Sequence, residues 1–194
     1  MRSNSELLSS SRHLLSGIWL PAIGAFLVVS IISSAGSSFT LGVLPLLLAG
    51  PLGVGQSNYF LSIARSGRPR FEEVFSGFNA FVRNMAIGLL VALAVGLGTL
   101  LLIIPGIILG VGLSMAYYIA IDRPELDAPD VLKASWELVW KGGHFWKVFG
   151  FMLLAALLTI LGLLCFGVGV LFTTPMVLVG QAALYDELRS STAY

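Results

Sequence analysis

The sequence carries almost no charge over most of its length. Its 11 Lys and Arg and its 10 Asp and Glu residues fall into four short segments, 2–12, 65–83, 122–147 and 186–189. A soluble domain carries charge on about a quarter of its residues. This chain has 11% charged and 57% hydrophobic residues, with a mean hydropathy of +0.92. These values exclude an ordinary soluble fold and favour an integral membrane protein.

The residues of common catalytic and metal sites are also lacking. The one cysteine, Cys165, excludes an internal disulfide, and we expect it to be a small apolar packing residue. No G-x-S-x-G, P-loop or H-E-x-x-H pattern occurs. The net charge of +1 gives no basis for nucleic-acid binding. We therefore expect no enzymatic activity, no metal, no cofactor and no nucleic-acid partner, but we do expect bound lipid.

Three blocks without charge separate the charged segments: 14–64, 84–121 and 148–185. A transmembrane helix needs about 20 apolar residues, so each block has room for two helices and a turn. A membrane β-barrel would need alternating polarity, which runs such as LLVALAVGL do not have. The predicted fold class is an all-α polytopic membrane protein. Its six transmembrane helices are predicted at 17–35, 40–64, 84–104, 106–121, 146–165 and 170–188.

The charge pattern also predicts the orientation of the chain. The turns expected at 36–39, 104–106 and 166–169 carry no Lys or Arg. The second turn is expected there because Pro105 removes a backbone donor and the glycine after it permits a bend. Under the positive-inside rule the charged segments lie in the cytoplasm. Both termini are then cytoplasmic, and nothing folded is expected on the outer side.

An amphipathic stretch precedes each pair of predicted spans. In the second stretch, apolar residues recur at helical spacing at Phe71, Val74, Phe75, Phe78 and Phe81. The third stretch repeats this pattern with two tryptophans, and the first is shorter and weaker. Such helices normally lie in the headgroup region of a bilayer. We therefore expect interfacial helices on the cytoplasmic side.

The three units, each a stretch followed by a helix pair, resemble one another. In the second span of each unit an aromatic residue follows a glycine at the same spacing, at Phe60, Tyr117 and Tyr185. Two spans per unit return the chain to its starting side, so the units share one orientation. We predict a single membrane domain over 1–194 with three internal repeats. The repeats cover approximately 5–66, 71–123 and 127–189.

Several segments resemble a known bacterial family. They are GPLGVGQSNYFLSIARSG from Gly50, FEEVFSGF from Phe71, LLIIPGIILGVGLSMAYYIAID from Leu101 and GVGVLFTTPMVLVGQAALYDEL from Gly167. They resemble the bacterial membrane proteins of the domain of unknown function 975 family, and more distantly the membrane domain of some glycerophosphodiester phosphodiesterases. The resemblance implies a six-helix protein of the bacterial inner membrane. It implies no established activity and brings no catalytic residues to this chain.

Five polar residues inside the predicted spans form a candidate site. They are Gln56, Ser57, Asn58, Ser114 and Gln181. Polar side chains in membrane interiors usually hydrogen-bond across helices, so these residues can serve as contacts that hold the bundle together. The alternative is a polar solute site near the midplane of the bilayer.

Small residues recur at every fourth position at Gly106, Gly110 and Ser114. Such a stripe lets two helices approach closely. The close approach can occur inside the bundle or against a partner protein. The stripe is therefore a candidate packing surface, with its partner helix left open by the sequence.

Four arginines lie between the first and second predicted helix pairs, at Arg65, Arg68, Arg70 and Arg83. Cationic clusters beside membrane spans attract anionic lipid headgroups. They also orient the chain across the membrane. We predict lipid-headgroup contacts for these four side chains.

These features together predict a non-catalytic membrane scaffold or accessory subunit that docks other integral membrane proteins or membrane lipids. The alternative is a small-solute or lipid permease with a polar site at the midplane. Ion-coupled permeases usually carry ionisable residues within the bilayer. The uncharged blocks contain no Asp, Glu, Lys, Arg or His, which favours the scaffold.

Overall fold

The computed structural model describes residues 2–39, 43–164 and 168–192. Within these ranges every regular element is a helix, which confirms the all-α prediction. Cys165 and the first two residues of the turn predicted at 166–169 lie outside the described residues, and the last two begin a helix. The elements are α1 (Asn4–Leu14), α2 (Trp19–Phe39), α3 (Val43–Ser66), η1 (Phe71–Phe78), α4 (Phe81–Leu101), α5 (Ile103–Leu113), α6 (Ala116–Asp122), α7 (Ala128–Trp140), α8 (Phe145–Leu164) and α9 (Val168–Thr192).

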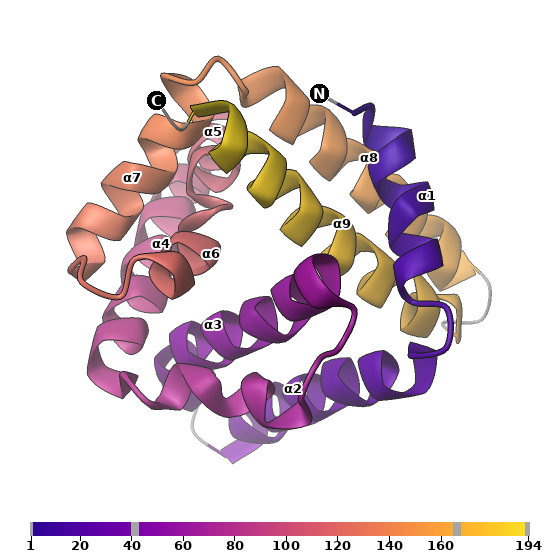
Figure 1. Ribbon diagram of the computed structural model, residues 1–194. Coiled ribbons are helices and arrows are strands. Elements are labelled where there is room, and N and C mark those ends of the chain that lie inside the picture. Colours follow the sequence, from indigo (N-terminus) through magenta and orange to yellow (C-terminus); the bar gives the residue numbers. More distant parts are fainter. Residues whose placement is uncertain (1, 40–42, 165–167, 193–194) are drawn as a thin grey trace.

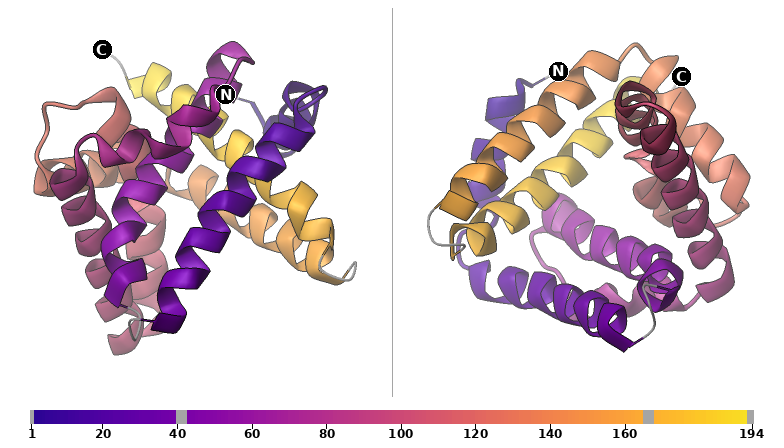
Figure 2. Two further views of the ribbon diagram at one scale, coloured as in Figure 1. Left: turned by 90° about the horizontal axis from the view of Figure 1, so that it is seen from below. Right: turned by 180° about the vertical axis from the view of Figure 1, so that it is seen from behind.

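Three helix pairs determine the shape of the molecule (Figure 1). The pairs are α2 with α3, α4 with α5, and α8 with α9, and one of the short helices α1, η1 and α7 precedes each pair. α3 lies at the centre, packed against α2, η1, α4, α6 and α9. In the left view of Figure 2 the far ends of the first two pairs point down, and the α8–α9 pair is splayed to the right. Both chain termini lie at the opposite end of the molecule.

Three helical segments are long and apolar enough to cross a membrane: Phe81–Leu101, Ile103–Asp122 and Phe145–Leu164. A fourth is added if Asn4–Leu14 and Trp19–Ser34, which meet at a bend of 106°, are taken as one span. These segments were found among the described residues. Their composition is compatible with the membrane protein that the sequence predicts.

Two of the predicted turns lie elsewhere in the structure. The turn expected at 36–39 is helical, because α2 continues to Phe39. The turn expected at 104–106 lies at Leu102, whose φ of −158° and ψ of 141° separate α4 from α5. Pro105 therefore occupies the first turn of α5, where a missing backbone N–H costs no hydrogen bond. The proline begins a helix instead of ending the previous one.

The helix predicted at 106–121 is interrupted. α5 ends at Leu113 and α6 begins at Ala116. Near the interruption the Ser135 hydroxyl of α7 donates to the Gly112 carbonyl at 2.8 Å. Trp136 also packs against Gly112, so closely that a Cβ at this glycine would lie 2.5 Å from the indole ring. The interruption and the missing side chain together let α7 dock on α5 and α6.

α3 and α4 approach each other through Gly50 and Gly88, where a Cβ on either residue would collide with the other backbone. Asn84, one turn before Gly88, is buried and donates from Nδ2 to the Gly77 carbonyl of η1 at 2.6 Å. Small residues and buried amides are typical of helix contacts in membrane proteins. These contacts fix η1 and α4 against α3.

Candidate functional site

An ionic junction joins the ends of α3, α6 and α9. Arg65, in the last turn of α3, donates from Nη1 and Nη2 to the two Asp122 oxygens at 2.9 and 2.8 Å. Its Nε and Nη2 donate to Asp186 at 3.0 and 2.6 Å. The Arg189 guanidinium and the Tyr185 hydroxyl donate to Asp122 at 2.6 and 2.9 Å. Two positive and two negative side chains therefore meet at one point.

The ionic junction is suited to holding helices together. Arginine that bonds a carboxylate through two nitrogens is specific in geometry and stronger than a single contact. The Asp122 side chain is only 10% exposed, and it accepts hydrogen bonds from Arg65, Arg189 and Tyr185. Because three donors occupy the carboxylate, it is poorly placed to take a proton from a substrate. The junction connects residues that are 57 and 121 positions apart in the chain.

A second ionic contact lies beside the first. Glu187 of α9 accepts from the Lys147 ammonium of α8 at 2.8 Å and from the Arg2 backbone N–H at 2.6 Å. The Lys147 and Glu187 side chains are 16% and 13% exposed. This contact ties the start of the chain to the α8–α9 pair, so the charged ends of the helices are linked on both sides of α9.

The arginines predicted to bind headgroups differ in their surroundings. Arg65 is held in the ionic junction. Arg83 points into the protein and donates to three backbone carbonyls at the end of α6 and in the loop that follows, at 2.6 to 3.3 Å. Arg68 and Arg70 lie on the exposed connection before η1. The structure therefore does not gather the four side chains into one cluster.

The five predicted polar residues point in different directions. Gln181 of α9 donates from Nε2 to the Ser114 carbonyl at 3.4 Å, at the interruption between α5 and α6. Asn58 donates from Nδ2 to the Ser76 hydroxyl of η1 at 3.0 Å. Ser57 is buried within the bundle, and Gln56 is half-buried on α3. The structure thus brings Gln181 and Ser114 together and directs Asn58 toward η1.

The small-residue stripe packs within its own helix pair. A Cβ at Gly106 would lie 2.7 Å from the Thr99 backbone, and a Cβ at Gly98 would lie 3.2 Å from Gly106 Cα. A Cβ at Gly110 would meet Val95 at 3.9 Å. The first two members of the stripe therefore face α4, in the arrangement expected for internal helix packing.

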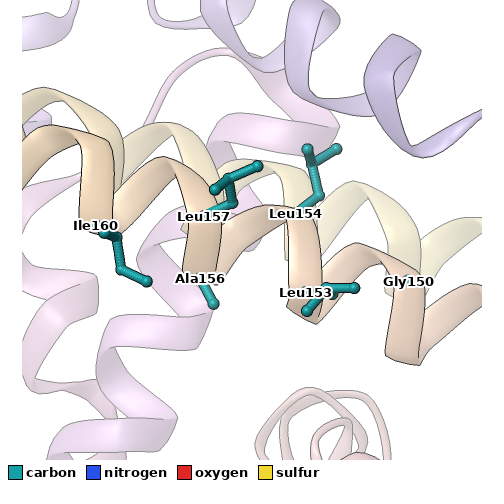
Figure 3. A pocket seen from close by; sticks show the side chains of 6 residues that line it. All are labelled: Gly150, Leu153, Leu154, Ala156, Leu157 and Ile160. Atoms are coloured by element: carbon teal, nitrogen blue, oxygen red, sulfur yellow. The ribbon is translucent and has the colours of Figure 1, made fainter.

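An apolar groove runs along α8 (Figure 3). Its volume is about 340 Å³. In Figure 3, Leu153, Ala156 and Ile160 point to one side of the helix, and Leu154 and Leu157 point to the other. None of the five predicted polar residues lines this groove. The residues that line it are Gly150, Leu153, Leu154, Ala156, Leu157 and Ile160.

The ionisable groups outside the spans have local, structural causes for their pKa shifts. The backbone N–H of Ser3 binds the Glu6 carboxylate and lowers its pKa. The Lys141 ammonium, 2.7 Å away, lowers the pKa of Glu137. Burial lowers the pKa of His144, with a smaller contribution from a nearby lysine. In the part of the chain that the structure describes, no group of three His, Cys, Asp or Glu side chains could hold a metal ion.

The ionic junction is the feature that sequence reasoning missed. The predicted repeats contain one signal for it, because Arg65 and Asp122 lie at equivalent positions after Gly55 and Gly112. Opposite charges at equivalent ends of repeated helices are expected to meet if those ends converge. The sequence does not show that the ends converge, so Arg65 was interpreted as a headgroup contact.

No protein-family model matches this chain, and no curated protein or solved structure does. The function must then be inferred from the molecule itself, and three of its features are used for this. They are the ionic junction, the polar residues that bond within the protein, and the apolar groove on α8.

Proposed function

We propose that this protein is a non-catalytic scaffold or accessory subunit of the bacterial inner membrane, in the family with the domain of unknown function 975. Its apolar helix faces dock other integral membrane proteins or membrane lipids. Six segments cross the membrane and both termini are cytoplasmic. In chain order the spans are α2, α3, α4, α5 with α6, α8 and α9. α3 returns antiparallel to α2, and α9 returns antiparallel to α8.

One observation carries the proposal: polar candidate residues bond within the protein, while the groove on α8 is apolar. Gln181 and Asn58 both donate to groups of the same chain. Along the groove, the Leu153 and Leu157 side chains are 63% and 53% exposed. Helices in a membrane associate through van der Waals packing and lack a hydrophobic driving force between them. An apolar groove in a span therefore suits a helix or an acyl chain better than a polar solute.

Purification in mild detergent tests the scaffold directly. We expect a second membrane protein or tightly held lipid to co-purify in a fixed ratio, and we expect Leu157→Gln in the groove to reduce that ratio. The matched control is Leu93→Gln, because Leu93 is an exposed leucine of α4. If both variants lost the co-purifying protein or lipid to the same extent, a specific role for the groove would be contradicted.

A small-solute or lipid permease is the second candidate. The Gln181–Ser114 contact favours it, because interrupted helices frame the solute sites of many transporters. Recovery of the chain alone, followed by solute flux in proteoliposomes that Gln56→Leu abolishes, would overturn the scaffold and support the permease.

The orientation is tested by labelling with a membrane-impermeant maleimide in a Cys165→Ser background. Ser37→Cys is expected to be labelled from outside intact cells. Glu125→Cys, in the exposed loop before α7, is expected to be labelled only after lysis. The reverse pattern would overturn the proposed orientation.

A further inference from the structure

Four phenylalanines form a continuous row on the surface of η1 and the start of α4. The Phe row consists of Phe71, Phe75, Phe78 and Phe81, whose side chains are 44%, 40%, 36% and 37% exposed. Successive ring centroids lie 6.2, 6.5 and 6.1 Å apart. These separations lie within the range of aromatic pairs in contact. The row is therefore one connected aromatic surface.

The helical form of η1 explains why the rings of Phe75 and Phe78 line up. η1 is a 3₁₀ helix, and side chains three positions apart in such a helix are eclipsed. Phe75 and Phe78 follow this spacing within η1, and Phe81 is added as the first residue of α4. An α-helix would offset residues three positions apart by about 60° around its axis. The sequence predicted one apolar face for this stretch, whereas the structure has two.

The second apolar face of η1 is fixed to α3. Val74 is fully buried. A Cβ at Gly77 would collide with the Pro51 carbonyl, and a Cβ at Gly55 would collide with the Val74 carbonyl. Backbones in such close contact leave no room for η1 to turn over. The Phe row therefore faces away from the protein as a consequence of packing on the opposite side.

The Phe row is continuous with the apolar surface of a membrane span. Phe81 is the first residue of the segment Phe81–Leu101, which is apolar enough to cross a membrane. On that segment Val82 and Leu97 are 72% and 55% exposed. The row thus extends the lipid-facing surface of α4 at the end where α4 begins. Amphipathic helices at the membrane interface bury phenylalanine and leucine side chains at this level.

Two arginines lie beside the row. The Arg70 side chain is 79% exposed, and its contact with Glu73 is long, at 3.5 Å. Arg68 is exposed on the same connection, and Glu72 is the one exposed acid nearby. Glu73 itself is turned inward, with 16% of its side chain exposed. The four charges over 68–73 sum to zero, but the two guanidinium groups are exposed whereas one of the two carboxylates is turned inward, so the cationic groups are the more accessible to an anionic headgroup.

We propose that the Phe row with Arg68 and Arg70 is a binding site for anionic phospholipid at the membrane interface. The phenylalanine rings contact the upper acyl chains, and the two guanidinium groups hold the phosphate. This inference rests on the membrane location in the proposed function and names the lipid class that one of its surfaces binds. Because η1 is fixed to α3, the bound lipid sets the depth of the α3–α4 pair in the bilayer.

The depth of the row is measured by fluorophore quenching in nanodiscs that contain phosphatidylglycerol. Labels are placed one at a time in the Cys165→Ser protein by Phe75→Cys, Leu97→Cys and Glu125→Cys. We expect the labels at 75 and 97 to be quenched by lipids brominated on the acyl chain and shielded from iodide. The label at 125 is expected to show the opposite.

The three positions separate the possible failures. Iodide quenching at both 75 and 97 would show that α4 is not in the bilayer, which contradicts the proposed function. Iodide quenching at 75 with bromine quenching at 97 would overturn only the lipid site. Shielding of 75 from both quenchers would indicate a covering protein and would also overturn the lipid site.

Headgroup selectivity is tested by native mass spectrometry of lipid retained on the purified protein. The double variant Arg68→Gln with Arg70→Gln is expected to retain less phosphatidylglycerol, by about fivefold for each arginine. Retention of phosphatidylcholine should not change. Arg68→Lys with Arg70→Lys should restore most of the difference, because it keeps the charge. Equal retention in the glutamine variant and the parent protein would contradict the role of the arginines.

Discussion

α3 and α8 are apolar helices of similar length that differ in their surroundings. α3 has partners on most of its sides, and its Phe60, Leu61 and Ile63 side chains are fully buried. α8 is richer in leucine, yet its Leu153 and Leu157 side chains are more than half exposed. In lipid, hydrophobicity does not decide which helix lies inside, because lipid tails are as apolar as leucine. Close contacts of small and polar residues decide it.

The largest expected effect comes from removing a close backbone contact of α3. Gly50→Ala should destabilise the protein by about 3 kcal/mol, because the added Cβ collides with the α4 backbone. Gly96→Ala is the matched control, since a Cβ there meets nothing within 4 Å. It should be neutral or slightly stabilising. SDS titration in mixed micelles measures the unfolding free energy of both variants. An equal loss of unfolding free energy in Gly50→Ala and Gly96→Ala would contradict the packing argument.

A smaller difference is expected for leucines on the two helices. Leu61→Ala in α3 should cost about 2 kcal/mol, because packing around the deleted side chain is lost. Leu157→Ala in α8 should leave the unfolding free energy unchanged, since that side chain faces outward. The same SDS titration compares them. A cost at Leu157 as large as that at Leu61 would show that α8 is also a core helix.

The ionic junction at the end of α3 should contribute less than its packing. Asp122→Asn is expected to cost about 1–2 kcal/mol, because hydrogen bonds between the carboxylate and two partly exposed arginines are lost. Added salt should reduce the difference from the parent protein. Glu137→Gln removes the exposed pair with Lys141 and should not change the melting temperature. A Tm unchanged by Asp122→Asn would refute the structural role of the junction.

The smallest effect should be confined to the first turn of α1, where Glu6 is exposed. Hydrogen bonds from Ser3 lower the pKa of Glu6 below its ordinary value of 4.5. The ionised carboxylate therefore stabilises the start of α1 above that pH, and the stabilisation is lost as pH falls through the lowered pKa. The protection factors of amides in the first turn of α1, which correct for the intrinsic pH dependence of exchange, should fall on acidification. Glu6→Gln should abolish this pH dependence, and its persistence would assign it to another group.

The sequence predicts the helices better than it predicts their contacts. The absence of charge is sufficient to locate Phe81–Leu101 and Phe145–Leu164, because a span needs only a long apolar run. The interruption near Ser114 is different, since it depends on Trp136 packing against Gly112 from a separate helix. No local pattern encodes a contact of that kind.

Contacts between distant segments also explain why the sequence does not predict the partners of the candidate site residues. Four arginines close in sequence predict one cationic cluster, but Arg65 and Arg83 find carboxylates and carbonyls far along the chain. The polar residues inside the predicted spans likewise suggest one site. In the structure Asn58 donates to Ser76 of η1, whereas Gln181 donates to the Ser114 carbonyl between α5 and α6. Neighbours on a helix point in different directions, so their partners follow from tertiary packing.

The order of synthesis gives the ionic junction a further consequence. Arg65 and Asp122 leave the ribosome well before Asp186 and Arg189, so the ionic junction is completed only when α9 has been made. Until then Arg65 has only half of its final partners. A chain arrested before α9 therefore has a neutral Arg65–Asp122 pair that lacks the hydrogen bonds of Asp186, Arg189 and Tyr185, and the folding of α9 supplies them.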